Sequence, residues 1–159
     1  MSKLADYGII LMTELAWRTE ADENLSATEL AGRTGLPAPV VSKILKVLTK
    51  EGLLRSQRGA NGGYALAKRP ERVTVAQVIR AMEGPIAMTE CLEPHGDCRQ
   101  EAVCPVRRNW NKINLAVEAV LDSITLLDML DPLPDHLVSL TEGPLEMGAT
   151  SSIRHAPGF

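Results

Sequence analysis

Apolar residues in this chain mostly recur at intervals of three and four, which is the spacing of one face of an α-helix. The first such stripe lies between Ser2 and Glu20 and predicts a helix whose broad apolar face enters the core. Its members are Leu4, Ile9, Ile10, Leu11, Met12, Leu15, Ala16 and Trp17. The run Ser26-Ala27-Thr28-Glu29 has the S-x-x-E form of a capping box and predicts a short second helix that ends at Gly35.

A third helix is expected after the proline turn at residues 36–39, and Gly52 ends it. Its inward positions are apolar, namely Val40, Val41, Ile44, Leu45, Val47 and Leu48. Its outward positions are Ser42, Lys43, Lys46 and Lys50. Two helices joined by a tight turn, the second of them basic, predict a helix-turn-helix.

Residues 53–57 and 64–67 are short strand candidates on either side of a turn that is rich in Gly and Asn. That turn is Arg58-Gly59-Ala60-Asn61-Gly62-Gly63, and the whole segment predicts a β-hairpin wing. Thr74 then caps a helix that runs to about Met82, before Gly84-Pro85 ends it.

A polar loop from Met88 to Val103 precedes a long helix that begins at Pro105. Apolar residues form a narrow stripe along that helix, as in a two-stranded seam, and indicate a dimer helix. The stripe consists of Val106, Trp110, Ile113, Val117, Val120 and Ile124. Thr125 caps one more short helix through Leu130, after which prolines and glycines leave too little apolar periodicity to fold.

The expected fold is therefore mainly α, a winged helix-turn-helix with a small β-hairpin wing plus a long dimerisation helix. We assign the winged unit to 1–83, a cysteine-bearing loop to 84–104, the dimerisation helix and short terminal helix to 105–130, and a flexible tail to 131–159. Aromatic residues make up only 3% of the chain, which agrees with an aliphatic core on helices.

The net charge of the chain is −3, but basic and acidic residues are distributed unevenly along it. The segment 1–83 has 12 basic and 9 acidic residues, whereas 84–159 has 5 and 11. Between Lys43 and Arg80, nine basic residues accompany two acidic ones, the footprint expected for contact with phosphates. A solvated basic face would have the same charge, so the expectation of a double-stranded DNA partner rests on the charge, the helix and the wing together.

The start of the basic helix is where base edges in a major groove come within reach. The expected DNA contacts are Ser42, Lys43, Lys46 and Lys50 on the helix and Arg58, Asn61 and Gly62 on the wing. Arg58 suits a minor groove, whose negative potential attracts a guanidinium group. Glycines beside it would let the wing backbone approach the sugar-phosphate chain closely.

Three cysteines, Cys91, Cys98 and Cys104, lie within 14 residues of the polar loop. Soft thiolates suit an iron-sulfur cluster, zinc or Cu(I), but structural zinc sites usually show close C-x2-C pairs and four protein ligands. We therefore favour an iron-sulfur cluster, 2Fe-2S or 4Fe-4S, over zinc and over three unligated thiols. An odd number of cysteines, with neither a secretion signal nor an apolar run of about 18 residues, leads us to expect a cytoplasmic protein outside the membrane.

Four segments carry a family resemblance: Lys3-Leu4-Ala5-Asp6-Tyr7-Gly8, 41–46, 58–64 and 91–107. They resemble the IscR- and NsrR-type iron-sulfur transcription regulators, and most of all the subgroup that regulates SUF cluster-assembly genes. The resemblance covers about 1–130. It implies a homodimer in which each long helix crosses to the partner, cluster occupancy that alters DNA binding, and repression as the usual outcome.

The chain departs from the IscR pattern at one position. IscR-like proteins have a histidine ligand three residues after the last cysteine, where this chain has Arg107, which stays protonated and cannot ligate iron. In NsrR-like relatives an aspartate of the other subunit completes the site, and Asp6 aligns with it. Asp6 is equally suited to a favourable interaction with the helix dipole, and His95 is the second candidate ligand.

The predicted function is thus an iron-sulfur-dependent DNA-binding regulator of cluster-assembly or iron and redox stress genes. The chain has no C-x-x-C motif and no nucleotide-binding glycine fingerprint, so we do not expect an enzyme. A zinc-stabilised winged-helix repressor and a thiol redox enzyme are the alternatives.

Overall fold

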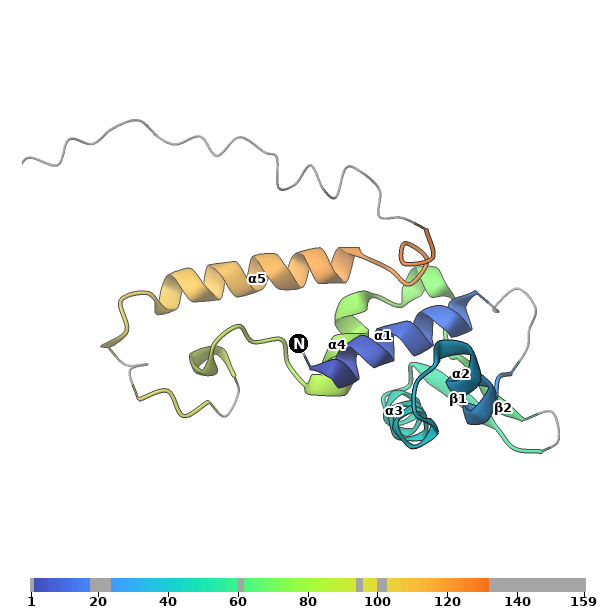
Figure 1. Ribbon diagram of the computed structural model, residues 1–159. Helices are drawn as coiled ribbons and strands as arrows, with labels where there is room; N and C mark the ends of the chain where they lie inside the picture. The colour runs from blue at the N-terminus through green and yellow to red at the C-terminus, as the bar shows by residue number, and fades with distance from the viewer. Residues whose placement is uncertain (1, 18–23, 60–61, 94–95, 100–102, 132–159) are drawn as a thin grey trace, which may run out of the picture.

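The computed structural model describes residues 2–17, 24–59, 62–93, 96–99 and 103–131, and helices dominate this part of the chain (Figure 1). The elements follow in the order α1 (Lys3–Ala16), α2 (Ala27–Thr34), α3 (Ala38–Lys50), β1 (Leu54–Gln57), β2 (Gly63–Leu66), the 3-10 turn η2 (Pro70–Arg72), α4 (Val75–Glu83), the 3-10 turn η3 (Glu90–Leu92) and α5 (Arg107–Ser123). The expected mainly α, winged helix-turn-helix architecture is confirmed. Asn61, His95 and the expected tail from residue 132 onward lie outside the described residues.

Local caps fix where the helices of the winged unit begin. The Ser26 hydroxyl accepts from the Glu29 N–H at 3.2 Å while the Glu29 carboxylate accepts from the Ser26 N–H at 2.8 Å, so the predicted capping box is present. Thr74 and Gln77 form the same reciprocal pair at the start of α4. These caps satisfy backbone N–H groups that have no partner within the helix.

The hairpin is a two-stranded antiparallel sheet in which Leu54 lies opposite Leu66 and Gln57 opposite Gly63. A bridge outside the sheet ties it to the segment before α2, because Leu25 and Tyr64 exchange backbone hydrogen bonds of 3.0 and 2.8 Å. Tyr64 and Leu66 thus face the helices, and the two strands are attached to the helical core beside α3 (Figure 1).

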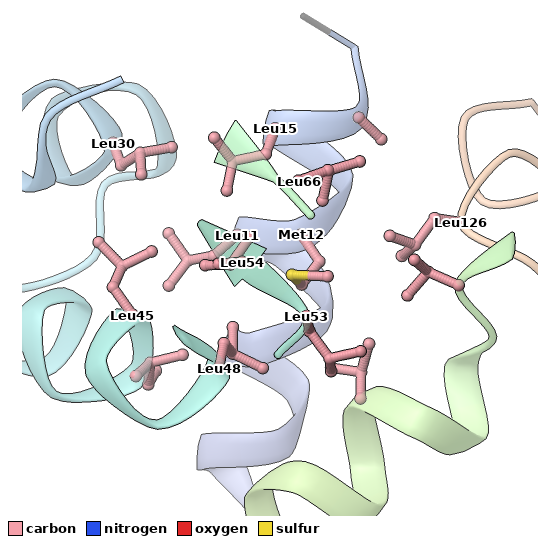
Figure 2. Close-up of a cluster of buried hydrophobic side chains, with 14 of the residues drawn as sticks. Leu11, Met12, Leu15, Leu30, Leu45, Leu48, Leu53, Leu54, Leu66 and Leu126 are labelled. Atoms are coloured by element: carbon pink, nitrogen blue, oxygen red, sulfur yellow. The ribbon is translucent and has the colours of Figure 1, made fainter. Parts of the chain in front are cut away.

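Buried side chains from every part of the winged unit, most of them leucines, form one core (Figure 2). Leu11 and Leu15 of α1 pack with Leu45 and Leu48 of α3, in line with the predicted inward faces. Leu126 enters this core from the segment after α5 and is fully buried. Its N–H donates to the Val73 carbonyl oxygen at 2.8 Å, so the chain after α5 is anchored to the winged unit.

Three expectations about helices need correction. The apolar stripe of α1 is not all core, because Ile10 is 39% exposed and Trp17 60% exposed. The last helix begins at Arg107, because residues 105–106 form a turn that precedes its first helical turn. Residues 126–130 form turns instead of the expected short helix, although Thr125 caps them as predicted by accepting from the Asp128 N–H at 3.2 Å.

Candidate functional site

The outer face of α3 is a stripe of lysines. Lys43, Lys46 and Lys50 are spaced three and four residues apart, so they share one face, and all three are exposed. None of them forms an ion pair with another described residue, which leaves their charges available to an external anion. Ser42 is half-buried beside them, in agreement with a position at the edge of that face.

The wing presents Arg58, which is exposed, directly after β1. The turn that follows is tight: the Gly62 N–H donates to the Gly59 carbonyl oxygen at 3.0 Å. A Cβ at Gly62 would lie 2.9 Å from that same oxygen and still closer to the Gln57 carbonyl oxygen, so a side chain does not fit there. Glycine at residue 62 is therefore required by the turn itself, whether or not DNA approaches.

A second basic surface lies at the base of the hairpin. Arg55, Lys68, Arg69 and Arg72 line a shallow pocket of about 460 Å³, and all four are exposed. Arg69 is paired with Glu71 at 3.1 Å. The sequence placed these residues in a basic segment without singling them out, because their convergence depends on how the hairpin packs.

The three cysteines are half-buried and free of disulfides. Cys91 lies in η3, Cys98 in the loop after it, and Cys104 three residues before α5. Partly accessible thiols suit an iron-sulfur cluster chemically. The described residues do not bring three or more His, Cys, Asp or Glu side chains together in a group that could hold a metal ion.

Asn114 holds the start of the cysteine loop to α5. Asn114 is 8% exposed, and of the 17 residues of α5 it is the one that is buried. Its side-chain oxygen accepts from the Met88 N–H at 2.9 Å, and its side-chain nitrogen donates to the Ile86 carbonyl oxygen at 2.9 Å. Thr89, the next residue, shares a hydrogen bond of 3.2 Å with the Cys91 sulfur.

Asp6 lies in the first turn of α1 and is exposed, so the structure is compatible both with a helix-dipole role and with a ligand role toward another molecule. It lines a groove of about 430 Å³ along α1 together with Ile9, Ile10 and Trp17. The groove also contains the Thr13 hydroxyl, which is buried without a hydrogen-bond partner among the described residues.

Arg80 joins α4 to α5. Its two terminal nitrogens donate to the two carboxylate oxygens of Asp122 at 2.9 and 2.8 Å, and one lies 3.9 Å from Glu118. The Arg80 hydrogen bond lowers the pKa of Asp122 below its ordinary value, and the same bond raises the pKa of Arg80. No local pattern in the sequence indicates this pair, because 42 residues separate its members.

The predicted seam on α5 is uncovered in the single chain. Trp110, Ile113 and Val120 are 36, 45 and 42% exposed, an unusual state for large apolar side chains that are three and seven residues apart along one helix. Figure 1 shows the C-terminal end of α5 beside α4, with the N-terminal half of α5 extending beyond the start of α1. Within the described residues, no helix is both long and apolar enough to cross a membrane.

Comparison with known proteins assigns this chain to a family. A family model named Rrf2, described as an iron-dependent transcriptional regulator, matches residues 1–132. The chain belongs to the Rrf2 family. It is 34% identical to the HTH-type transcriptional regulator CymR of Bacillus subtilis over 88% of this chain and 90% of CymR. It is 29% identical to the transcriptional repressor NsrR of Streptomyces coelicolor over 94% of this chain and 95% of NsrR.

Solved structures of Rrf2 relatives have the same fold. IscR of T. potens matches with a TM-score of 0.66 at 33% identity, over 86% of this chain and 89% of IscR. CymR of B. subtilis, described as the global cysteine regulator, matches with a TM-score of 0.65 at 34% identity, over 82% of this chain and 95% of CymR. These relatives are named as transcriptional regulators and not as enzymes, so this chain is a helix-turn-helix DNA-binding regulator of the Rrf2 family.

Proposed function

We propose that this Rrf2 protein is a homodimeric repressor whose affinity for its operator depends on an iron-sulfur cluster, and that it controls cluster-assembly or iron and redox stress genes. The observation that carries the proposal is the position of the three free, half-buried thiols. They lie on the segment that joins the winged unit to α5, where ligand binding can affect both parts.

In this proposal α3 enters the major groove and the wing follows the adjacent backbone. Lys46 and Lys50 bind phosphates, and Ser42 and Lys43 reach base edges or phosphates at the start of the helix. Arg58 enters the minor groove, with Asn61 and Gly62 beside the sugar-phosphate chain. The uninterrupted lysine stripe on α3 supports this orientation.

The homodimer accounts for two uncovered apolar surfaces. Trp110, Ile113 and Val120 of one subunit pack against the same helix of the other, which removes their exposed apolar area from water. The groove along α1, with exposed Ile10 and Trp17, then receives part of the partner's α5 region. Exposed apolar residues in a groove are typical of a protein interface.

Cys91, Cys98 and Cys104 are the proposed cluster ligands, and Asp6 of the partner subunit is the proposed fourth ligand. Such a cluster would supply redox and ligand-exchange chemistry at iron. Thiolates bind iron firmly, and a carboxylate exchanges more readily, which suits a sensor. Arg107 cannot replace Asp6, because a guanidinium group stays protonated. His95 is the alternative ligand.

The absorption spectrum of anaerobically purified protein tests the cofactor. A broad visible band from sulfur-to-iron charge transfer is expected, with iron and sulfide in stoichiometric amounts. A colourless protein that contains zinc would instead support a zinc-stabilised repressor. A colourless protein without metal would favour either a thiol-based regulator or the thiol redox enzyme. The similarity to the cysteine regulator CymR supports the first of these two alternatives.

Ligand substitutions test the assignment of the individual residues. Cys91→Ala, Cys98→Ala and Cys104→Ala should each abolish cluster binding. Asp6→Ala should retain a cluster that has an altered spectrum and is lost at least about tenfold faster, because the loss of even an outer-shell partner of a metal ligand typically costs about that much in affinity. Wild-type spectrum and lifetime in Asp6→Ala would reject Asp6, and His95→Ala would then be expected to show the effect.

A further inference from the structure

A polar stripe attaches α5 to its own chain. Asn114, Glu118 and Asp122 recur every four residues, so they share one face of the helix. The exposed apolar residues Ile113 and Val120 lie on a different face, whereas Trp110, four residues before Asn114, borders the polar stripe. The two faces of α5 therefore have separate tasks: one contacts the rest of the same chain, and the other is free to contact a second copy.

Asn114, at the N-terminal end of the stripe, binds the start of the cysteine loop. Asn114 makes two hydrogen bonds of 2.9 Å to backbone groups of residues 86 and 88, and it needs both its acceptor and its donor to do so. Thr89 follows directly and is hydrogen-bonded to the Cys91 sulfur. Because Asn114 is buried, movement of residues 86–88 away from α5 would leave polar groups without partners, which is costly.

Glu118 and Asp122, at the C-terminal end of the stripe, contact the winged unit. Arg80 of α4 bonds both carboxylate oxygens of Asp122, with Glu118 at 3.9 Å. Thr74, the cap of α4, donates to Asp122 as well, at 3.3 Å. Since α4 packs against both α1 and α3, a displacement of α5 along this contact reaches the DNA-binding helix.

We propose that Asn114 is a positioning residue for Cys91, and that the stripe of Asn114, Glu118 and Asp122 transmits the state of the cysteine loop to α4 and α3. A helix is stiff along its axis, so a change at residues 86–91 that pulls on Asn114 displaces Asp122 two turns away. The inference rests on the proposed function, because it takes Cys91 to be a cluster ligand. It adds a route within one subunit that does not pass through Asp6.

Three variants separate the two ends of the route. Asn114→Ala releases the loop, Arg80→Gln releases α4 without touching the loop, and Asn111→Ala is the matched control, because Asn111 is exposed on the same helix. Three quantities are measured on each dimer: hydrogen exchange of the Met88 amide in cluster-free protein, the rate of cluster loss to a chelator, and the ratio of operator affinities with and without the cluster.

Asn114→Ala should accelerate Met88 exchange and cluster loss by at least roughly fivefold, the factor that corresponds to one of the two lost hydrogen bonds, and should reduce the affinity ratio. Arg80→Gln should leave Met88 exchange and cluster loss as in the wild type and still reduce the affinity ratio. Asn111→Ala should match the wild type in all three. If Asn114→Ala does not fold, Asn114→Ser is measured in its place. The serine side chain keeps a polar group at this position but is too short to reach both backbone partners.

Unchanged Met88 exchange and cluster loss in Asn114→Ala would overturn the positioning role. An unchanged affinity ratio in both Asn114→Ala and Arg80→Gln would overturn the transmission route. Failure of the proposed function looks different, since wild-type protein would then contain no iron and sulfide. In that case transmission from a cluster is rejected outright, and Met88 exchange still decides whether Asn114 holds the loop.

Discussion

Single charged residues on α3 and the wing are where DNA binding should be most directly measurable. Lys46→Ala and Arg58→Ala should each weaken operator binding and lower the slope of log affinity against log salt by about one unit, because each removes one positive charge that displaces a counterion from the DNA. Both side chains are exposed, so the dimer should stay folded. Filter binding across a salt series gives the slope, and Lys112→Ala, on the exposed surface of α5, is the control. Unchanged slopes for both variants would exclude the proposed docking face.

The Arg80–Asp122 ion pair makes stability depend on pH. Folding lowers the pKa of Asp122, so the pair stabilises the folded chain above the ordinary carboxyl pKa of about 4, and this contribution is lost as the pH falls through the lowered pKa. Asp122→Asn should therefore unfold at a lower urea concentration than the wild type near pH 7. Its free energy of unfolding should be lower by no more than about 1 kcal/mol, because both side chains of the pair are partly exposed. The difference should disappear in strong acid. Asp131→Asn, at an exposed position, should show no such difference at any pH.

At the scale of elements, the hairpin depends on a close approach of two backbones. A Cβ on Gly63 would lie 2.7 Å from the carbonyl oxygen of Leu25, and φ at Gly63 is +156°. Gly63→Ala should destabilise the protein by about 1–3 kcal/mol, because the Leu25–Tyr64 bridge must open to admit the methyl group. Gly32→Ala is the contrasting control: nothing lies within 4 Å of its Cβ, and alanine should stabilise α2 by about 0.5–1 kcal/mol. Thermal unfolding of both variants measures the two effects.

Most elements could be predicted because their signals are local. The Ser26 and Thr74 caps and the glycine-rich turn each depend on residues within a few positions of one another, and the structure contains all three features. Apolar periodicity was less reliable, because it identifies a face that avoids water without saying what covers it. Trp17 and Ile10 continue the stripe of α1 and yet lie at its surface, beside a groove.

At the scale of the whole molecule, the decisive contacts join residues that are far apart in sequence. Leu126 enters the core of the winged unit, which was predicted to end at residue 83, and Arg80 bonds Asp122 across 42 residues. No local pattern marks these contacts. Asn114 is one of several polar residues in the predicted long helix, and only the structure gives its partners in the cysteine loop.

The assembly of two chains through α5 is the feature on which operator recognition depends. Ile113 is 45% exposed at the centre of the uncovered apolar stripe, so Ile113→Asp adds a charge that is harmless on a free surface and costly in a dry seam. We expect this variant to be monomeric or insoluble in sedimentation experiments, and to bind an operator with two half-sites no better than a single half-site. Asn111→Asp introduces the same charge two residues earlier, at an exposed polar position, and should remain a dimer. A soluble Ile113→Asp dimer with wild-type operator affinity would show that α5 does not form the interface, and would leave the groove along α1 as the surface to substitute next.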